Sequence, residues 1–294
     1  MRIPFAFARL LQQLEPTAGG VTKAKLHAHS IKRRLVSSFE LKNSFFIGSS
    51  MRETAIRGYS DVDLFTVFPR QALKWGSGWI SSDTFVRNIR NDLNERFPAT
   101  DVRRDAQAIV VHFGGGSEPV DVVPAVFHAF KTEHRVPVFL IPDGRGGWLE
   151  TAPAAHNNYI KAANAKSGGK LRKAIQLIKH WRNSRSPAIP LSSIHLELLL
   201  ASSGICIGPK GYATCVFEVF DLLRSRECRG LRDPVGLAGT LHSARTEAQA
   251  TRLIDAVEHA WMHAAKALLA EREKDWSEAF RQWSLVFNGE FPSR

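Results

Sequence analysis

The chain of 294 residues has few of the features that mark membrane-spanning, secreted or disulfide-bonded proteins. No run of about 18 apolar residues could span a bilayer, and the N-terminal segment lacks the long apolar region and cleavage site of a secretory signal. The three cysteines, Cys206, Cys215 and Cys228, match neither a disulfide framework nor a paired-cysteine zinc site. We therefore expect a soluble globular protein, cytoplasmic and without a membrane partner, whose thiols are buried and inert.

Acidic residues are also scarce: 28 Asp and Glu stand against 40 Lys and Arg, a formal net charge of +12. Such an excess favours an anionic partner, either nucleotide or nucleic acid. The segment from Lys161 to Arg185 carries eight Lys and Arg and no acidic residue. A run of this kind can equally be a solvated helix face, so the charge alone does not identify the partner.

Hydrophobic periodicity divides the chain into two halves, and no internal repeat or low-complexity tract interrupts it. The first half predicts a small mixed sheet with helices, and the second half predicts helices only. In the first half we expect helices over 21–39 and 82–97, the latter capped by Ser82 or Asp83. Strands are expected at 44–48, 60–68, 108–113 and 120–127, the last two joined by a glycine-rich hairpin.

The segment 137–153 is rich in turn formers and predicts the boundary between the halves. Beyond it, Leu171, Ile175, Ile178 and Trp181 recur at helical spacing and predict one buried stripe. Further helices are expected at 192–202, 213–226, 244–271 and 275–287. The predicted class is α+β, with a catalytic lobe over 1–150 and a helical lobe over 151–294; the long N-terminal helix is expected to brace the second lobe too.

Two carboxylates in the strand at 60–68 carry the chemistry. Asp61 and Asp63 alternate with Val62 and Leu64, so both carboxylates face one side of the sheet and the apolar pair faces the core. Like charges so close need cations, and carboxylate oxygens suit Mg²⁺. With Asp121 from a neighbouring strand, three carboxylates could hold two ions for phosphoryl displacement, and Mn²⁺ could substitute.

A small turn, Gly48, Ser49 and Ser50, precedes this pair. Small residues let backbone N–H groups approach a phosphate, and a helix beginning at Ser50 would point its positive end at that anion. Ser50 and Glu53 also fit a helix capping box, which would occupy the Ser50 hydroxyl. We therefore favour Ser49 as the side chain that contacts phosphate.

The Gly-Ser pair, the Asp-x-Asp triplet and the later lone Asp121 resemble the nucleotidyltransferase superfamily of DNA polymerase beta. Within it, "GSSMRETAIRGYSDVDL", "VDVVPAV", "IPDGRGGWLETAP", "KLRKAIQLIKHWR" and "LSSIHLELL" look most like the cGAS/DncV-like nucleotidyltransferases (CD-NTases). The resemblance covers nearly the whole chain. The clustered Cys and His of the zinc insertion in animal cyclic GMP-AMP synthase are missing.

The resemblance implies a polymerase-beta-like lobe and a helical lobe that closes a nucleotide cleft. It further implies that Asp61, Asp63 and Asp121 are catalytic and metal-binding, that Lys179 contacts the triphosphate, and that Ser193 borders the nucleoside. The implied activity joins nucleoside triphosphates, as donor and acceptor, into a cyclic di- or oligonucleotide messenger with release of pyrophosphate, in bacterial anti-phage (CBASS-type) signalling. A monomer is expected, and a nucleic-acid or protein activator stays open.

Three other functions remain open at this point: transfer of AMP to an antibiotic or a protein, synthesis of a linear oligonucleotide, and a non-catalytic nucleic-acid-binding adaptor. The complete set of three carboxylates speaks against the adaptor. His195 could be interpreted as a catalytic residue, and Trp148 as a residue that borders a base. Both are more typical of ordinary packing than of catalysis or base contact.

Overall fold

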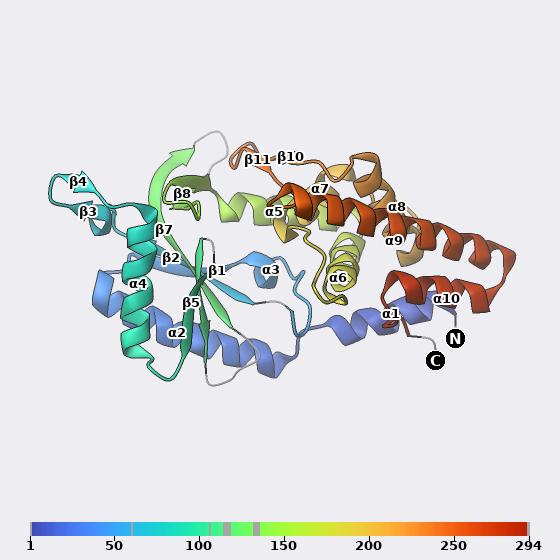
Figure 1. Ribbon diagram of the computed structural model, residues 1–294, viewed down its shortest axis with the longest axis horizontal. Coiled ribbons are helices and arrows are strands. Elements are labelled where there is room, and N and C mark those ends of the chain that lie inside the picture. Colours follow the sequence, from blue (N-terminus) through green and yellow to red (C-terminus); the bar gives the residue numbers. More distant parts are fainter. Residues whose placement is uncertain (1, 60, 106, 114–118, 132–135, 293–294) are drawn as a thin grey trace. The chain divides into compact units, whose positions relative to one another are not determined.

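The computed structural model describes residues 2–59, 61–105, 107–113, 119–131 and 136–292 (Figure 1). Contacts between Cα atoms divide the chain into two compact units. The sheet unit is Pro16–Asn157, and the helical unit is Asn158–Arg294 together with the chain up to Glu15. The expected division at residues 150 and 151 therefore corresponds to one at 157 and 158, and the first helix belongs with the helical unit.

The sheet unit is built on one seven-stranded sheet of order β1-β2-β7-β6-β5, with β8 and β9 continuing from β7 (Figure 1). Among the strand pairs that the structure describes in this sheet, β2–β7 is parallel and the others are antiparallel. The strands are β1 (Asn43–Ile47), β2 (Val62–Phe68), β5 (Asp101–Asp105), β6 (Ala108–His112), β7 (Val120–Lys131), β8 (Val136–Pro142) and β9 (Trp148–Thr151). The predicted α+β class is confirmed.

Strand alternation gives this sheet two apolar faces. Leu64 and Phe68 pack in one core with side chains of α2 (Ala18–Phe39) and α4 (Ser82–Arg96). Phe65 and Val67 point to the opposite face and pack with Phe139 of β8. The face of Asp61 and Asp63 is therefore the one opposite the two helices, as the alternation predicted.

The helix caps of this unit differ in one place from expectation. The Oγ of Ser81, not of Ser82 or Asp83, accepts the hydrogen bond that caps α4, from the backbone N–H of Thr84 at 3.2 Å. Ser82 is buried as the first helical residue, and the carboxylate of Asp83 pairs with Arg104 instead. A cap must accept from the second or third helical N–H, and the register of α4 gives that place to Ser81.

The segment 137–153, which is rich in turn formers and was predicted as the boundary between the halves, contains most of β8 and all of β9. In β8, Val136, Val138 and Ile141 are buried, and β8 pairs antiparallel with both β7 and β9. The turn formers serve only the connection, where Asp143 Oδ1 accepts from the N–H groups of Arg145 (2.7 Å) and Gly147 (2.9 Å). A short η1 helix (Arg70–Leu73) and the hairpin of β3 (Lys74–Trp75) and β4 (Gly78–Trp79) complete the unit. The predicted glycine-rich hairpin between β6 and β7 falls mainly on residues 114–118, outside the described part.

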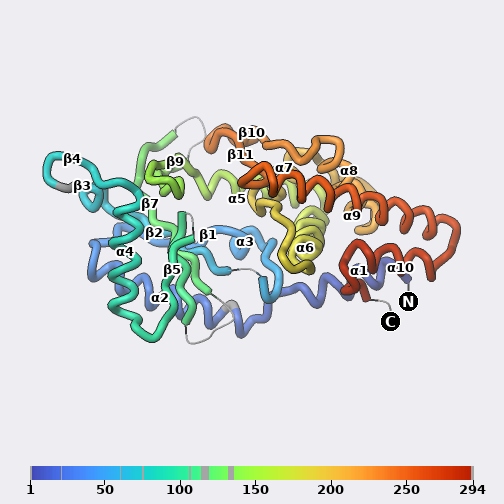
Figure 2. The backbone as a smooth tube through the Cα atoms, viewed as in Figure 1, coloured from blue at the N-terminus to red at the C-terminus, as the bar shows by residue number. Residues whose placement is uncertain are grey.

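The helical unit confirms the helices predicted in the second half of the chain. The buried stripe of α6 carries Leu171, Ile175, Ile178 and Trp181, each at most 2% exposed. Its elements are α1 (Ile3–Leu14), α5 (Pro153–Lys166), which crosses the division, α6 (Lys170–Asn183), α7 (Ser193–Ser203), α8 (Tyr212–Ser225), β10 (Leu231–Arg232), β11 (Thr240–Leu241), α9 (Glu247–Glu273) and α10 (Trp276–Val286). Figure 2 shows α9 turning back into α10 as a helical hairpin near the end of the chain.

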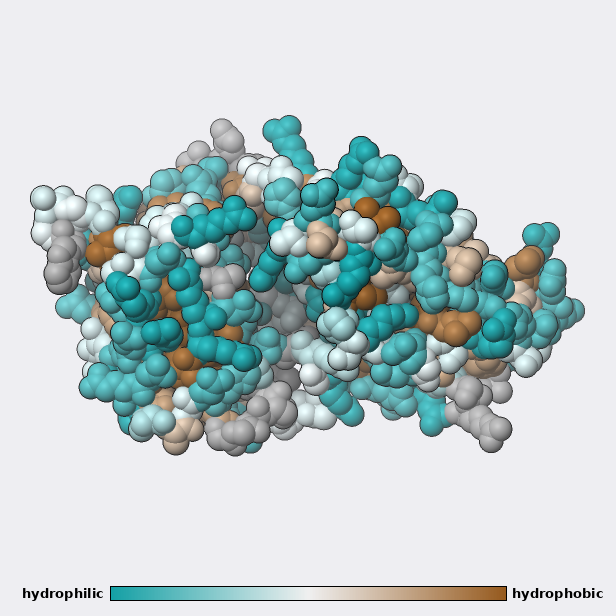
Figure 3. Space-filling view, viewed as in Figure 1, coloured by the Kyte–Doolittle hydropathy of each residue, from teal (hydrophilic) through white to brown (hydrophobic). Residues whose placement is uncertain are grey.

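Two further predictions concern the cysteines and membrane-spanning helices. All three cysteines are buried and free, as predicted. The face drawn in Figure 3 is mostly hydrophilic, with hydrophobic residues in small scattered patches. Within the described ranges, each helix is too short or too polar to cross a membrane.

Candidate active site

The three predicted carboxylates meet at the start of β2 and β7. Asp63 and Asp121 are direct partners in the parallel β2–β7 pair, so their side chains stand on the same face, about 4.8 Å apart in backbone spacing. Asp61 lies two residues before Asp63 and shares that face by alternation. The structure therefore brings together the three side chains that the sequence placed on separate segments.

The same row of the sheet continues onto two further strands. Asp121 pairs with Val110 of β6, and Val110 pairs with Arg103 of β5. Arg103 thus faces the same side as the carboxylates, and its guanidinium lies 3.1 Å from His112 Nε2. Asp105, two residues further along β5, shares this face. Arg103, Asp105 and His112 were not predicted as site residues, because the pairing of β5 with β6 brings them to the site and no local pattern specifies that pairing.

The clustered carboxylates have too little positive charge near them to balance their own negative charge. Burial, followed by the charges of Asp61, Asp63 and Asp105, raises the pKa of Asp121 to about 8. Burial also raises the pKa of Asp61, which His112 and Arg103 partly oppose. Oδ1 of Asp121 is buried and, among the described residues, has no hydrogen-bond partner. Such an oxygen is an available ligand for a cation.

These residues fit magnesium in chemistry, although the carboxylates are not preset around an ion. In the part of the chain that the structure describes, no three His, Cys, Asp or Glu side chains are arranged to hold a metal ion as they stand. An ion would draw the carboxylates of Asp61, Asp63 and Asp121 inward. The positive charge of the ion would offset the repulsion among the carboxylates, and the ion would give Oδ1 of Asp121 a partner.

The turn before the carboxylates is built around Gly48. Its φ is +72°, and a Cβ at this residue would lie 1.7 Å from Oδ2 of Asp63. The carboxylate of Asp63 therefore rests directly against the backbone of the turn, in space that only glycine leaves. This contact joins the predicted turn and the predicted carboxylates into one site, and it explains why the two segments lie close together in the sequence.

The helix expected to begin at Ser50 begins at Gly48 and is a single turn, α3 (Gly48–Met51). The capping box does not form: Ser50 Oγ donates back to the carbonyl of Ile47 at 3.2 Å, and Glu53 leaves the helix with φ +56°. One turn adds little dipole, so an anion here would rely on individual N–H groups. Ser49 is half-buried within the same turn.

Lys179 and Ser193, the two predicted nucleotide contacts of the helical unit, already have protein partners. Lys179 is 2% exposed and its Nζ lies 2.6 Å from Glu197 Oε1, in a fully buried ion pair between α6 and α7. Ser193 Oγ accepts from Arg182 at 2.8 Å. Both side chains contribute to the internal packing of the helical unit.

Two residues of uncertain role are structural. His195 is fully buried in α7, with Nε2 at 3.1 Å from the carbonyl of Arg229. Trp148 packs on Phe85, with ring centroids 5.9 Å apart. The more ordinary interpretation of each is therefore supported.

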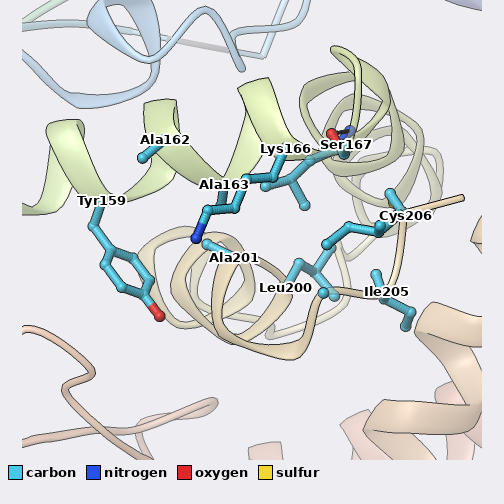
Figure 4. Close-up of a pocket in the computed structure, with 12 residues that line it drawn as sticks. Tyr159, Ala162, Ala163, Lys166, Ser167, Leu200, Ala201, Ile205 and Cys206 are labelled. Atoms are coloured by element: carbon cyan, nitrogen blue, oxygen red, sulfur yellow. Dashed lines mark hydrogen bonds between the residues drawn. The ribbon is translucent and has the colours of Figure 1, made fainter.

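A cavity of about 150 Å³ lies in the helical unit, between α5, α7 and the chain that follows α7 (Figure 4). Its wall is mainly apolar, with Leu200, Ala201 and Ile205 facing Ala163 and the stem of Lys166. Neither the carboxylates nor Lys179 and Ser193 line it. The cavity is therefore separate from every site residue predicted from the sequence.

Comparison with known proteins supports the family and the fold. Residues 1–164 match the family described as Second Messenger Oligonucleotide or Dinucleotide Synthetase domain (SMODS). A probable cyclic nucleotide synthase of Bacillus cereus is 23% identical over 279 residues, which cover 84% of this chain and 81% of the relative.

Two solved structures share the fold. CdnC of E. coli MS115-1, in complex with HORMA-deltaN, superposes with a TM-score of 0.75 at 20% identity over 98% of both chains. The cyclic AMP-GMP synthase DncV of Vibrio cholerae, bound to nonhydrolyzable GTP, gives 0.66 at 16% identity over 86% of this chain and 70% of its own. The predicted nucleotidyltransferase fold is confirmed.

Proposed function

We propose that this chain, which belongs to the SMODS family of cGAS/DncV-like nucleotidyltransferases, joins nucleoside triphosphates into a cyclic di- or oligonucleotide and releases pyrophosphate. The observation that carries the proposal is the set of half-buried carboxylates on one sheet face, with the Gly48 turn against Asp63. Nucleotide synthesis is the chemistry that such a set serves when it holds two ions.

Each carboxylate has a proposed role. Asp61 and Asp63 would hold both of two Mg²⁺ ions, for which Mn²⁺ could substitute. Asp121 would complete the site of the ion next to the attacking 2′ or 3′ hydroxyl, and it is also proposed to accept the proton of that hydroxyl. When bound, the ions would acidify the hydroxyl and neutralise charge on the α-phosphate and on the leaving pyrophosphate.

The other residues hold and orient the nucleotide. Backbone N–H groups at Gly48 and Ser49 are proposed to contact the phosphates, and Ser50 is proposed to support the turn through its bond to Ile47. A phosphate contact by Lys179 would require it to exchange Glu197 for the triphosphate. Ser193 would likewise have to leave Arg182 to border the nucleoside.

The biological setting is also a proposal. The relatives point to a bacterial messenger system, and we propose anti-phage (CBASS-type) signalling in the cytoplasm. CdnC is described in complex with HORMA-deltaN, so a protein of that kind is a candidate activator here. Nucleoside triphosphates are the proposed donor and acceptor, and the catalyst is proposed to act as a monomer.

The deciding assay supplies purified protein, Mg²⁺ or Mn²⁺ and only nucleoside triphosphates, and is repeated with a HORMA-type partner. We expect pyrophosphate release and a phosphatase-resistant product, since a ring has no terminal phosphate. A product that phosphatase degrades, mapped with phosphodiesterase, would identify a linear oligonucleotide synthase instead. Pyrophosphate that appears only with an aminoglycoside or a protein acceptor, with label on that acceptor, would identify an AMP transferase.

A further inference from the structure

Two histidines of α9 point their outer ring nitrogens at one another. His259 and His263 are one helical turn apart, and their Nε2 atoms lie 3.1 Å from each other. The ring centroids are 4.4 Å apart with planes at 63°, so the rings converge at Nε2 rather than stack. His259 is exposed and His263 is half-buried, which leaves the point of convergence open to solvent.

The neighbouring helix fixes the tautomer of one ring. Glu278 of α10, an acceptor paired with Arg281, receives a hydrogen bond from Gln282 Nε2 at 2.6 Å. The amide of Gln282 is thereby oriented with Oε1 toward His263 Nδ1, 2.5 Å away. An amide oxygen can only accept, so the proton of His263 is on Nδ1 and the lone pair is on Nε2.

This arrangement matches the surroundings of histidines that bind metals. A ligating histidine commonly donates its other ring N–H to an oxygen that holds the ring in place, the role that Gln282 fills. Two nitrogens 3.1 Å apart, each about 2.0–2.1 Å from one ion, subtend an angle of about 100° at the ion. That angle lies between the octahedral and tetrahedral values. The Nε2 atoms share a hydrogen bond that His259 donates, so an ion would replace this bond and His259 would carry its proton on Nδ1 instead.

The local charge narrows the class of ion. The guanidinium of Arg185 acts electrostatically on His259, and this repels cations that bind only through charge. Mg²⁺ prefers oxygen and would gain little from imidazole. Copper, zinc and nickel ions form strong bonds to neutral imidazole and can offset the repulsion.

We propose that His259 and His263 form a binding site for one divalent transition-metal ion on the α9–α10 hairpin, with Gln282 as the positioning residue and water as the remaining ligands. The site would cross-link one turn of α9 and stabilise the hairpin (Figures 1 and 2). The proposal concerns residues outside the proposed catalytic set and does not depend on the nucleotide function.

The test uses Cu²⁺ as probe on full-length protein without a polyhistidine tag, in excess Mg²⁺ to saturate the carboxylates. We expect one Cu²⁺ whose electron paramagnetic resonance spectrum shows coupling to two imidazole nitrogens. His263→Ala should abolish that signal, and Gln282→Ala should weaken binding by about 10- to 100-fold. His29→Ala removes an exposed histidine of α2 whose Nδ1 contacts the carbonyl of Lys25 and should change nothing.

Thermal unfolding separates binding from misfolding. Zn²⁺ should raise the melting temperature of the wild type and of His29→Ala but not of His263→Ala, whose metal-free melting temperature should stay near that of the wild type. An unchanged Cu²⁺ spectrum and affinity in His263→Ala would overturn the proposal. So would equal loss of the signal in His29→Ala.

Discussion

The two units of this protein treat buried charge in opposite ways. In the helical unit, Lys179 and Glu197 are both buried and neutralise each other at 2.6 Å. In the sheet unit, Asp61, Asp63 and Asp121 lie together, and one buried oxygen of Asp121 lacks a hydrogen-bond partner among the described residues. The Lys179–Glu197 pair needs no ligand to balance its charges, whereas the three carboxylates need bound cations to balance theirs. The difference distinguishes an ion pair satisfied within the protein from carboxylates that we propose to bind cations.

The largest expected effect comes from removing the gathered carboxylates. The double variant Asp61→Ala and Asp63→Ala should lower the rate of product formation by about 1,000-fold or more, because the proposed ions lose their shared ligands. Its metal-free fold should unfold no earlier than the wild type, since like-charge repulsion is relieved. Rates are measured as pyrophosphate release. Asp101→Ala, an exposed aspartate of β5, is the matched control and should retain wild-type rates; wild-type product from the double variant would contradict the assignment.

Breaking the ion pair between Lys179 and Glu197 should instead lower the free energy of unfolding. Lys179→Ala removes the cation that lies 2.6 Å from the buried Glu197 and should lower the free energy of unfolding by about 3–5 kcal/mol, measured by urea unfolding. Lys179→Met with Glu197→Leu should recover most of that loss. Lys131→Ala, at a partly exposed pair with Glu150, should cost at most about 1 kcal/mol. If Lys179→Ala were fully stable and raised only the KM for the triphosphate, Lys179 would be the phosphate ligand that the resemblance implied.

The contact between the turn and Asp63 should be the next most sensitive. Gly48→Ala places a methyl group where Oδ2 of Asp63 lies and strains a backbone with φ +72°, so we expect a rate loss of about 100-fold. Gly58→Ala is the control, since Gly58 has φ +77° and no heavy atom within 4 Å of an added Cβ. It shares the strain of about 1 kcal/mol but should keep its activity. Equal activity losses in the two variants would mean that backbone strain, and not the carboxylate contact, is responsible.

The last expected effect is on the pH dependence of stability in the absence of metal. The pKa of Asp121 is about 8 in the folded chain, above its value of about 4 when unfolded. Its contribution to stability is therefore complete below about pH 4 and is lost as the pH rises through 8. In EDTA, the free energy of unfolding of the wild type should fall between pH 5 and pH 8 relative to Asp121→Asn. Saturating Mn²⁺ should remove the difference in slope; parallel curves in EDTA would contradict the raised pKa.

The sequence predicted most of this arrangement where local patterns decide it. Alternation along 60–68 was enough to place Asp61 and Asp63 opposite the helical core, and the three- and four-residue steps of α6 were enough to find its buried stripe. Pairing between distant segments was harder. Arg103 and Asp105 reach the site only through the register of β5 on β6, which no local pattern specifies.

Burial of charge was the other quantity that the sequence did not reveal. Lys179 lies in a basic run that resembled either a solvated face or a phosphate contact, and its partner Glu197 is on another helix. The cap of α4 is Ser81 and not Ser82 or Asp83 as predicted, because the end of a helix can shift by one residue with little change in its hydrophobic pattern. In each case the missing information was a contact formed by packing.

The most direct test of the central claim is a titration of Mn²⁺ into metal-free wild type and Asp121→Asn, in the presence of a nonhydrolysable nucleoside triphosphate, with bound ions counted by electron paramagnetic resonance. Asp61, Asp63 and Asp121 are proposed to hold two ions, so the account predicts two bound Mn²⁺ in the wild type. It predicts that Asp121→Asn loses one of these ions, because an uncharged carboxamide replaces the carboxylate whose buried Oδ1 has no hydrogen-bond partner among the described residues. Identical Mn²⁺ binding by the two proteins would contradict it.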